Sequence, residues 1–366
     1  MLAKSFYTAV AVFTASVASQ TFTSCNPLEK TCPAHPALGA NSIKCDFTKG
    51  KCDAFNHNPG TTINYSDKGA LFSIENDKQA PTIASKKYIF FGRVDVELMA
   101  SPGQGVVTSV VLQSGDLDEI DWEWVGGHND EVQTNYFGKG DTTTYDRGAK
   151  HPVTAPLTTF HTYSIEWTSK KVDWIIDNKV VRTLNYADAK GGSRFPQTPM
   201  EVKLGTWVAG LQGNSEGTVE WAGGYTDFTK APFQAFYKSI SVVDYAGGDV
   251  PPKDSIKEYL YGDKTGSWES IKVVKGESSN DSKDDVKVSS TTLQAVPSAS
   301  STASGTASAS GTKTTGASNP AVTHTPNNGT STTPSTLPVS GANSNIISLF
   351  GSIFTVVAAA MIIPVF

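Results

Sequence analysis

The chain has 366 residues, a formal net charge of −5 and a sequence pI of about 5.7. Its 30 Lys and Arg residues form no basic block, which argues against nucleic acid as a partner because phosphate binding needs clustered cations. The 32 glycines and 19 prolines argue against a helical bundle or a coiled coil.

Aromatic residues indicate where a packed core can form. The chain has 7 Trp, 12 Tyr and 17 Phe, and all but six of these lie between residues 20 and 268. We therefore expect one folded domain over residues 20–270, followed by a long tail.

Residues 1–19 are typical of a secretory signal peptide. Lys4 is followed by the short apolar run 6–13 and then by small residues at positions 15, 16, 18 and 19, where a peptidase can cut. A retained anchor is the weaker alternative because the run is too short to span a bilayer.

Four cysteines follow, and in a secreted chain they imply disulfides. They are Cys25, Cys32, Cys45 and Cys52. The two C-x6-C spacings favour two local bridges, Cys25–Cys32 and Cys45–Cys52, although three connectivities are formally open. Neither spacing matches a zinc site, and no metal or other cofactor is expected.

The core is expected to consist of strands. Runs with β-type patterning are 92–98, 106–113, 131–137, 161–168, 200–208 and 236–245. Residues 172–181 predict a hairpin that turns at Asp177-Asn178, and short helices are expected at 187–194 and 253–262. Many short strands in one domain predict an all-β fold, a jelly-roll sandwich of two antiparallel sheets with a concave cleft.

The segment 117–125 (LDEIDWEWV) is the most informative part of the sequence. As a strand, it places Glu119, Asp121 and Glu123 on one face, and its apolar residues on the other. Like charges this close resist ionisation, so a purely structural strand gains nothing from them. A solvated acidic face is the plainer interpretation, but the large apolar face that backs the acids disfavours it.

The spacing of these acids suits glycosidase chemistry. The Cα atoms of Glu119 and Glu123 are expected ~13 Å apart at ~3.3 Å per residue. Carboxyls that lean inward from this separation come to about 5 Å, the spacing of a retaining pair. Sugar binding also needs aromatic platforms, for which Trp207, Trp221 and Tyr225 are candidates. A calcium site is the alternative, but no calcium-loop spacing is present.

The C-terminal part is expected to be a stalk (271–342) followed by a removed signal for a glycosylphosphatidylinositol anchor (343–366). The stalk is rich in Ser, Thr, Ala and Pro and cannot offset chain entropy by burial. The apolar run 346–366 follows small residues, with Gly341 as the expected attachment residue. A transmembrane helix is the alternative, since 21 residues just span a bilayer. The absence of Lys or Arg after Lys313 favours the anchor.

Acceptor sequences for N-glycosylation fit a route through the secretory pathway. They begin at Asn64, Asn280 and Asn328.

The stretch DEIDWEW resembles the E-x-D-x-E motif of glycoside hydrolase family 16, jelly-roll enzymes that cut β-linked glucans and related polymers. The run 132–137 resembles the following strand of plant xyloglucan endotransglucosylases. With its signal peptide, paired cysteines, stalk and anchor signal, the whole chain resembles the fungal Crh-type cell-wall transglycosylases. The resemblance covers about residues 20–270, and the motif lacks the extra residue that some members carry, which predicts an unbulged strand.

The resemblance implies catalytic roles. Glu119 would be the nucleophile that forms a glycosyl-enzyme, Glu123 would be the acid and then the base, and Asp121 would tune both neighbours. The expected sugar contacts are Gln133, Asn135, Lys203, Trp207, Thr218, Trp221 and Tyr225.

The function implied is a retaining transglycosylase that cuts chitin and joins the new end to β-1,3- or β-1,6-glucan or to chitin. The partners are then polysaccharides and, through the lipid anchor, the outer leaflet of the plasma membrane, with the protein a monomer in the cell wall. A hydrolytic endo-β-glucanase or chitinase of the same fold is one alternative, and a non-catalytic wall lectin is another. The three carboxylates disfavour the lectin, which needs only aromatic and polar groups.

Overall fold

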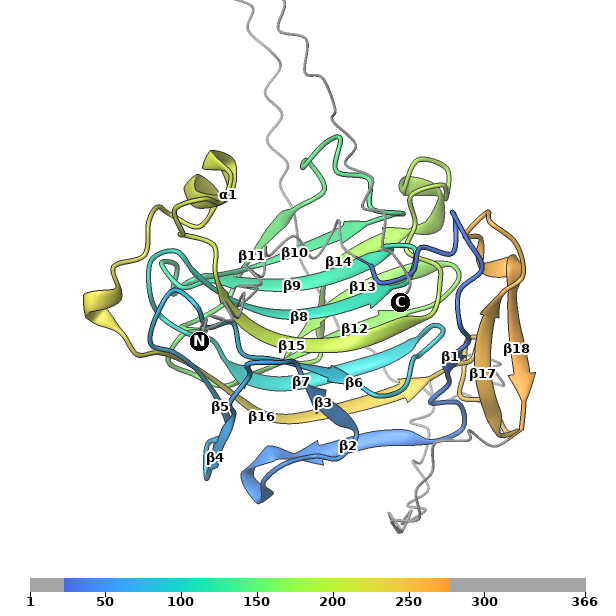
Figure 1. Ribbon diagram of the computed structural model, residues 1–366, viewed down its shortest axis with the longest axis horizontal. Coiled ribbons are helices and arrows are strands. Elements are labelled where there is room, and N and C mark those ends of the chain that lie inside the picture. Colours follow the sequence, from blue (N-terminus) through green and yellow to red (C-terminus); the bar gives the residue numbers. More distant parts are fainter. Residues whose placement is uncertain (1–22, 277–366) are drawn as a thin grey trace, which may run out of the picture. The chain divides into compact units, whose positions relative to one another are not determined.

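The computed structural model describes residues 23–276. They form two large sheets packed face to face and a third, small sheet at one end (Figure 1). The expected signal peptide, the stalk and the anchor segment, with Asn280, Asn328 and Gly341, lie outside the described residues.

Every pairing between the named strands is antiparallel. The first sheet has the order β11 (Ala149–Pro152), β10 (Glu131–Phe137), β9 (Glu119–Val125), β8 (Val106–Ser114), β15 (Met200–Val208), β6 (Thr82–Ser85) and β3 (Phe55–His57). The second has the order β14 (Lys179–Asn185), β13 (Lys171–Ile176), β12 (His161–Trp167), β7 (Gly92–Met99), β16 (Phe233–Asp244), β5 (Gly69–Ile74) and β4 (Asn64–Ser66), and β2 (Ser42–Asp46) also pairs with β16. The third contains β1 (His35–Pro36), β17 (Ile256–Tyr261) and β18 (Ile271–Lys275). The expected all-β sandwich is therefore confirmed.

Each strand run expected from the sequence is a strand of the sandwich. In β7 the residues alternate between buried and half-buried, as the pattern predicts for a strand with one face in the core. The hairpin of β13 and β14 turns at Asp177 and Asn178, which have φ values of 47° and 67°. Asp and Asn tolerate this left-handed conformation, which a two-residue hairpin turn requires.

The helices differ from expectation. Residues 253–262 contain β17 instead of a helix, because Ile256 and Tyr259 are buried where this strand pairs with β1 and β18. Residues 187–194 hold only the end of the short 3₁₀ helix Tyr186–Asp188, followed by turns. The one α-helix of the described residues, α1 (Glu216–Trp221), was not expected; it is capped by the side chain of Ser215.

Further 3₁₀ helices are short: Phe47–Lys49, Phe228–Lys230 and Trp268–Ser270. No helix within residues 23–276 is long and apolar enough to cross a bilayer. Strand structure continues to Lys275 in β18, a few residues past the expected domain end at residue 270.

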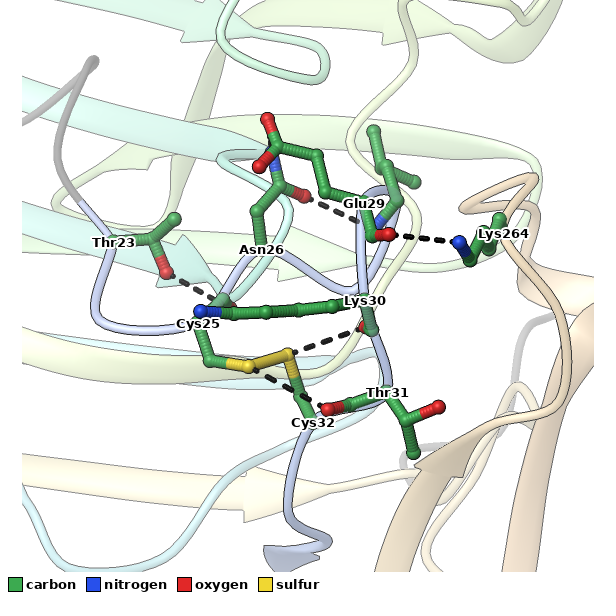
Figure 2. Close-up of a disulfide and its surroundings, with 9 residues drawn as sticks. Thr23, Cys25, Asn26, Glu29, Lys30, Thr31, Cys32 and Lys264 are labelled. Atoms are coloured by element: carbon green, nitrogen blue, oxygen red, sulfur yellow. Dashed lines mark hydrogen bonds between the residues drawn. A yellow bond between two sulfur atoms is a disulfide. The ribbon is translucent and has the colours of Figure 1, made fainter.

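Both disulfides have the expected local pairing. They join Cys25 to Cys32 and Cys45 to Cys52. In the first loop, the backbone carbonyl of Glu29 accepts a hydrogen bond of 2.7 Å from Nζ of Lys264 (Figure 2). Because Lys264 lies between β17 and β18, this disulfide loop is attached to the small third sheet. Asn64, in β4, is exposed, as an acceptor for glycosylation requires.

Candidate active site

The three carboxylates of β9 lie on the outer face of the first sheet. Glu119 and Asp121 are buried and Glu123 is half-buried, while the alternate residues Ile120, Trp122 and Trp124 are fully buried in the core. β9 pairs with β8 and β10 without a register shift, so the expected unbulged strand is confirmed. The alternation therefore sets all three acids side by side on a regular strand.

Aromatic side chains fix β9 from behind. The indole of Trp174 on β13 donates a hydrogen bond of 3.0 Å to the backbone carbonyl oxygen of Asp121. The indole of Trp122 donates one of 3.3 Å to the backbone carbonyl oxygen of Ser164 on β12. The rings of Trp124 and Tyr163 meet edge to face at 4.5 Å between centroids. These hydrogen bonds and ring contacts fix the position of β9 relative to the second sheet. Catalytic carboxylates need a rigid support of this kind.

Two polar side chains adjoin Glu119, those of Gln113 and Asp121. Nε2 of Gln113, which lies directly across on β8, donates to Oε2 of Glu119 at 2.6 Å. The carboxyl of Asp121 is the second partner. Among the described residues, no donor group reaches the oxygens of Asp121, so this contact is a hydrogen bond only when one of the two carboxyls carries a proton.

The proton is expected on Asp121. Burial raises the pKa of Asp121 well above its usual value, and the charges of Glu119 and Glu123 raise it further. A protonated Asp121 donates to Glu119, and donated hydrogen bonds favour the ionised form of a carboxylate. Gln113 and a protonated Asp121 thus both present a donor to Glu119.

Glu123 is placed to hold a proton at neutral pH. Burial, and then the charge of Glu119, raises its pKa from 4.5 to about 8. An ionised carboxylate and a protonated carboxyl on one strand face are the two groups that retaining glycoside hydrolysis requires.

The neighbouring strand β10 aligns the two expected polar sugar contacts with these acids. Gln133 is directly opposite Glu123, and Asn135 is directly opposite Asp121. Oε1 of Gln133 accepts a hydrogen bond of 2.9 Å from the indole of Trp221, which orients its amide. Gln133 and Asn135 are both half-buried and share the face of the acids.

Two tryptophans form a platform on this face, near the Glu123 end. Trp207 of β15 and Trp221 of α1 are stacked with ring centroids 6.2 Å apart and an interplanar angle of 25°. Both are half-buried and pack on Val107, Ala209 and Ala222. Apolar faces held rigidly beside carboxylates suit a sugar ring, which stacks on aromatic surfaces through its C–H face.

Two expected sugar contacts, Lys203 and Thr218, also have hydrogen-bond partners within the protein, and a third, Tyr225, is exposed. Nζ of Lys203 donates to Oε1 of Gln113 at 2.7 Å and lies 3.0 Å from Oε1 of Glu201, and both residues belong to the same sheet as Lys203. The hydroxyl of Thr218 meets that of Ser215 at 2.7 Å within the α1 cap. The side chain of Tyr225 is 59% exposed. The structure thus connects Lys203 to the acids through Gln113, and it places Thr218 in α1 together with the platform residue Trp221.

Sequence reasoning missed Gln113 and a buried acidic cluster at the start of β9. Asp116 and Asp118 are fully buried, with Nζ of Lys139 at 3.9 and 3.7 Å. Burial and the charge of Asp116 raise the pKa of Asp118 to about 7. The hydroxyl of Tyr261 on β17 donates to Asp116, which ties the third sheet to the entry of β9. The sequence shows Asp116 and Asp118, but no local pattern in it indicates that their side chains are buried.

Sequence reasoning also missed an exposed aromatic that packs on Phe137, the residue opposite the expected nucleophile on β10. The ring of Tyr145, 71% exposed, meets that of Phe137 at 6.4 Å, and Phe137 lies directly across from Glu119.

No group of three or more His, Cys, Asp or Glu in residues 23–276 could hold a metal ion.

Comparison with known proteins adds family information. The profile of the glycosyl hydrolases family 16 matches residues 51–223. Crh-like protein 3 of Aspergillus fumigatus is 46% identical over 273 residues, which cover 74% of this chain and 73% of that protein. Crh-like protein 2 of Botryotinia fuckeliana is 50% identical over 264 residues, 72% of this chain and 57% of that protein. The chain matches 62% of the length of Crh-like protein 5 of Aspergillus fumigatus. It therefore spans less than two thirds of the length of this protein and of the Botryotinia relative.

Among solved structures, a Crh5 transglycosylase in complex with NAG superposes with a TM-score of 0.64 at 50% identity. The match covers 68% of this chain and 99% of that one. An apo Crh5 transglycosylase gives a TM-score of 0.63 at 48% identity.

Proposed function

This chain belongs to glycosyl hydrolase family 16, among its Crh-like members, and we propose that it is a retaining transglycosylase that cleaves chitin and transfers the new end to β-1,3- or β-1,6-glucan or to chitin. The observation that carries this proposal is the pairing on one strand face of Glu119, which accepts hydrogen bonds, with Glu123, whose pKa is raised to about 8. The reaction crosslinks polysaccharides of the fungal cell wall.

In the first step, Glu119 attacks the anomeric carbon and forms a covalent glycosyl-enzyme. Glu123 gives its proton to the glycosidic oxygen as that bond breaks, so the leaving chain departs as a neutral alcohol. Asp121 supports Glu119 through their shared hydrogen bond until the carboxylate becomes an ester.

In the second step, Glu123 acts as a base. The ester of Glu119 no longer carries the charge that raised the pKa of Glu123, so Glu123 now ionises more readily. It takes the proton from a hydroxyl of the acceptor sugar, whose oxygen attacks the anomeric carbon and releases Glu119. Water in the place of the acceptor would give hydrolysis.

Gln133, Asn135 and the Trp207–Trp221 platform are proposed to bind the sugars around this centre. Gln133 faces Glu123 across the strand pair, and the platform lies at the same end of β9. Lys203, Thr218 and Tyr225 are the remaining proposed sugar contacts.

Incubation with chitin oligomers and a fluorescent laminarin oligomer, followed by mass analysis, tests the function. Labelled hybrid products are expected. Shortened chitin products alone would identify a hydrolase, and no product at all would identify a wall lectin.

Azide separates the roles of the two glutamates. In Glu119→Ala, azide should restore turnover with inversion at the anomeric carbon, because it attacks from the vacated side. In Glu123→Ala, substrates with a good leaving group should still be cleaved, and azide should give a product of retained configuration. Inversion by azide in the Glu123 variant would reverse the assignment.

We also propose that the protein is secreted, loses residues 1–19, and is held by a lipid anchor at the outer face of the plasma membrane and in the cell wall. The signal-like ends of the sequence support this. Deletion of residues 343–366 should release active enzyme into the medium. Mass spectrometry of the full-length mature protein would contradict the anchor if the apolar tail were retained.

A further inference from the structure

Three polar side chains on adjacent strands form a line that ends at the nucleophile. Nζ of Lys203 on β15 donates to Oε1 of Gln113 on β8 at 2.7 Å. Nε2 of Gln113 donates in turn to Oε2 of Glu119 on β9 at 2.6 Å. Gln113 is only 5% exposed, and it lies directly across the strand pair from Glu119.

The chemistry of the two outer groups allows only one orientation of the Gln113 amide. The ammonium of Lys203 has donors and no acceptor, so it must face the carbonyl oxygen of the amide. An ionised Glu119 has acceptors and no donor, so it must face the NH₂ group. A flipped amide would set donor against donor and acceptor against acceptor, and burial makes such a mismatch costly.

We propose that Gln113 is a positioning residue for the nucleophile Glu119, and that Lys203 acts on Glu119 through Gln113. This rests on the proposed retaining mechanism. Gln113 holds one carboxylate oxygen of Glu119 in place and favours the ionised form that attacks the anomeric carbon. Lys203 locks the amide in the orientation that makes this possible.

The test compares Gln113→Met and Lys203→Met in the full-length protein, with chitin oligomer as donor and laminarin oligomer as acceptor. Methionine keeps the volume and removes the hydrogen bond. For Gln113→Met we expect kcat to fall about 10- to 100-fold with KM for the donor unchanged, because a bond to a charged group is lost. The acidic limb of the pH profile of kcat/KM should move up by about one pH unit, since Glu119 then ionises less readily.

Lys203 provides the conservative control and a test of coupling. Lys203→Met should lower kcat less than Gln113→Met does, and Lys203→Arg, which can still donate to the amide carbonyl, should stay within about threefold of the wild type. In kcat, the double variant should match Gln113→Met alone, because Lys203 acts on Glu119 only through the amide. Lys238→Met, which removes a lysine paired with Glu97 on the second sheet, controls for loss of charge and should leave kcat unchanged.

Several results would overturn the proposal. For Gln113→Met, a raised KM with kcat unchanged would make Gln113 a sugar contact, and additive effects on kcat in the double variant would make Gln113 and Lys203 independent. If thermal unfolding shows that Gln113→Met does not fold, the comparison of Lys203→Met with Lys203→Arg tests the proposal.

A readout that needs no turnover separates this proposal from the proposed function. Titration of the Glu119 carboxyl by ¹³C NMR, assigned with Glu119→Gln, should show a midpoint about one pH unit higher in Gln113→Met than in the wild type. An unchanged midpoint would refute the role of Gln113. Absence of transfer in the wild type would refute the function and leave this measurement intact.

Discussion

Replacing Glu123 with glutamine is expected to stabilise the folded protein above neutral pH while abolishing turnover. Burial and the charge of Glu119 raise the pKa of Glu123 from 4.5 to about 8. A carboxyl with a raised pKa contributes full stability below its unfolded value of 4.5, and loses this contribution as the pH rises through 8. The active site therefore weakens the fold in the pH range where Glu123 must ionise.

The magnitude follows from the pKa shift. Each unit corresponds to about 1.36 kcal/mol, so the ionised carboxylate costs the folded state on the order of 4–5 kcal/mol above pH 8. Glutamine never ionises, and at pH 4 it replaces a carboxyl that is largely neutral in both the folded and the unfolded state. We therefore expect Glu123→Gln to leave the free energy of unfolding nearly unchanged at pH 4 and to raise it by on the order of 4–5 kcal/mol at pH 9.

Urea unfolding at both pH values, followed by tryptophan fluorescence, measures this difference. The matched control is Glu97→Gln on β7, whose carboxylate pairs with Lys238 at 2.8 Å on the second sheet. That variant loses a partly exposed ion pair and should be destabilised by about 1 kcal/mol or less at pH 9. A gain for Glu123→Gln that is equal at pH 4 and pH 9, or a loss at pH 9, would refute the reasoning.

Three further predictions concern the support of the site. Asp121→Asn should retain about a tenth of the wild-type kcat, because its amide still donates to the nucleophile, whereas Asp121→Ala should lose about 10²- to 10³-fold; equal losses would show that the donated bond is irrelevant. Trp221→Phe keeps the stacking but loses the bond to Gln133, so kcat/KM should fall about fivefold, and an unchanged value would mean that the bond does not orient the amide. Replacing both cysteines of the Cys25–Cys32 bridge with serine should lower the free energy of unfolding by about 2–3 kcal/mol with little change in kcat, measured by urea unfolding and by initial rates.

The sequence by itself determined the strands and the face of the acids. Side chains of a strand alternate between its two faces, so the pattern of 117–125 placed Glu119, Asp121 and Glu123 together without any knowledge of neighbouring strands. The two disulfides and the turn at Asp177-Asn178 were readable for the same reason, since each depends on residues close in the chain.

Elements that depend on distant partners were misread. Residues 256–261 form β17 because β1 and β18 pair with them, and the pattern within 253–262 alone suggested a helix. The helix α1 is too short for its period to show, and its Ser215 cap is a weak local signal.

Only the tertiary structure decided which groups surround the acids. Lys203 reaches Gln113, and Trp221 reaches Gln133, across about 90 residues of sequence, because β15 lies beside β8 and the chain after β15 returns to β10. Strand order is set by the sum of packing between the sheets, and no local pattern encodes it. Burial, which raises the pKa of Glu123, arises from the same assembly. The identity of the acids is thus local information, whereas their protonation and their support are properties of the whole fold.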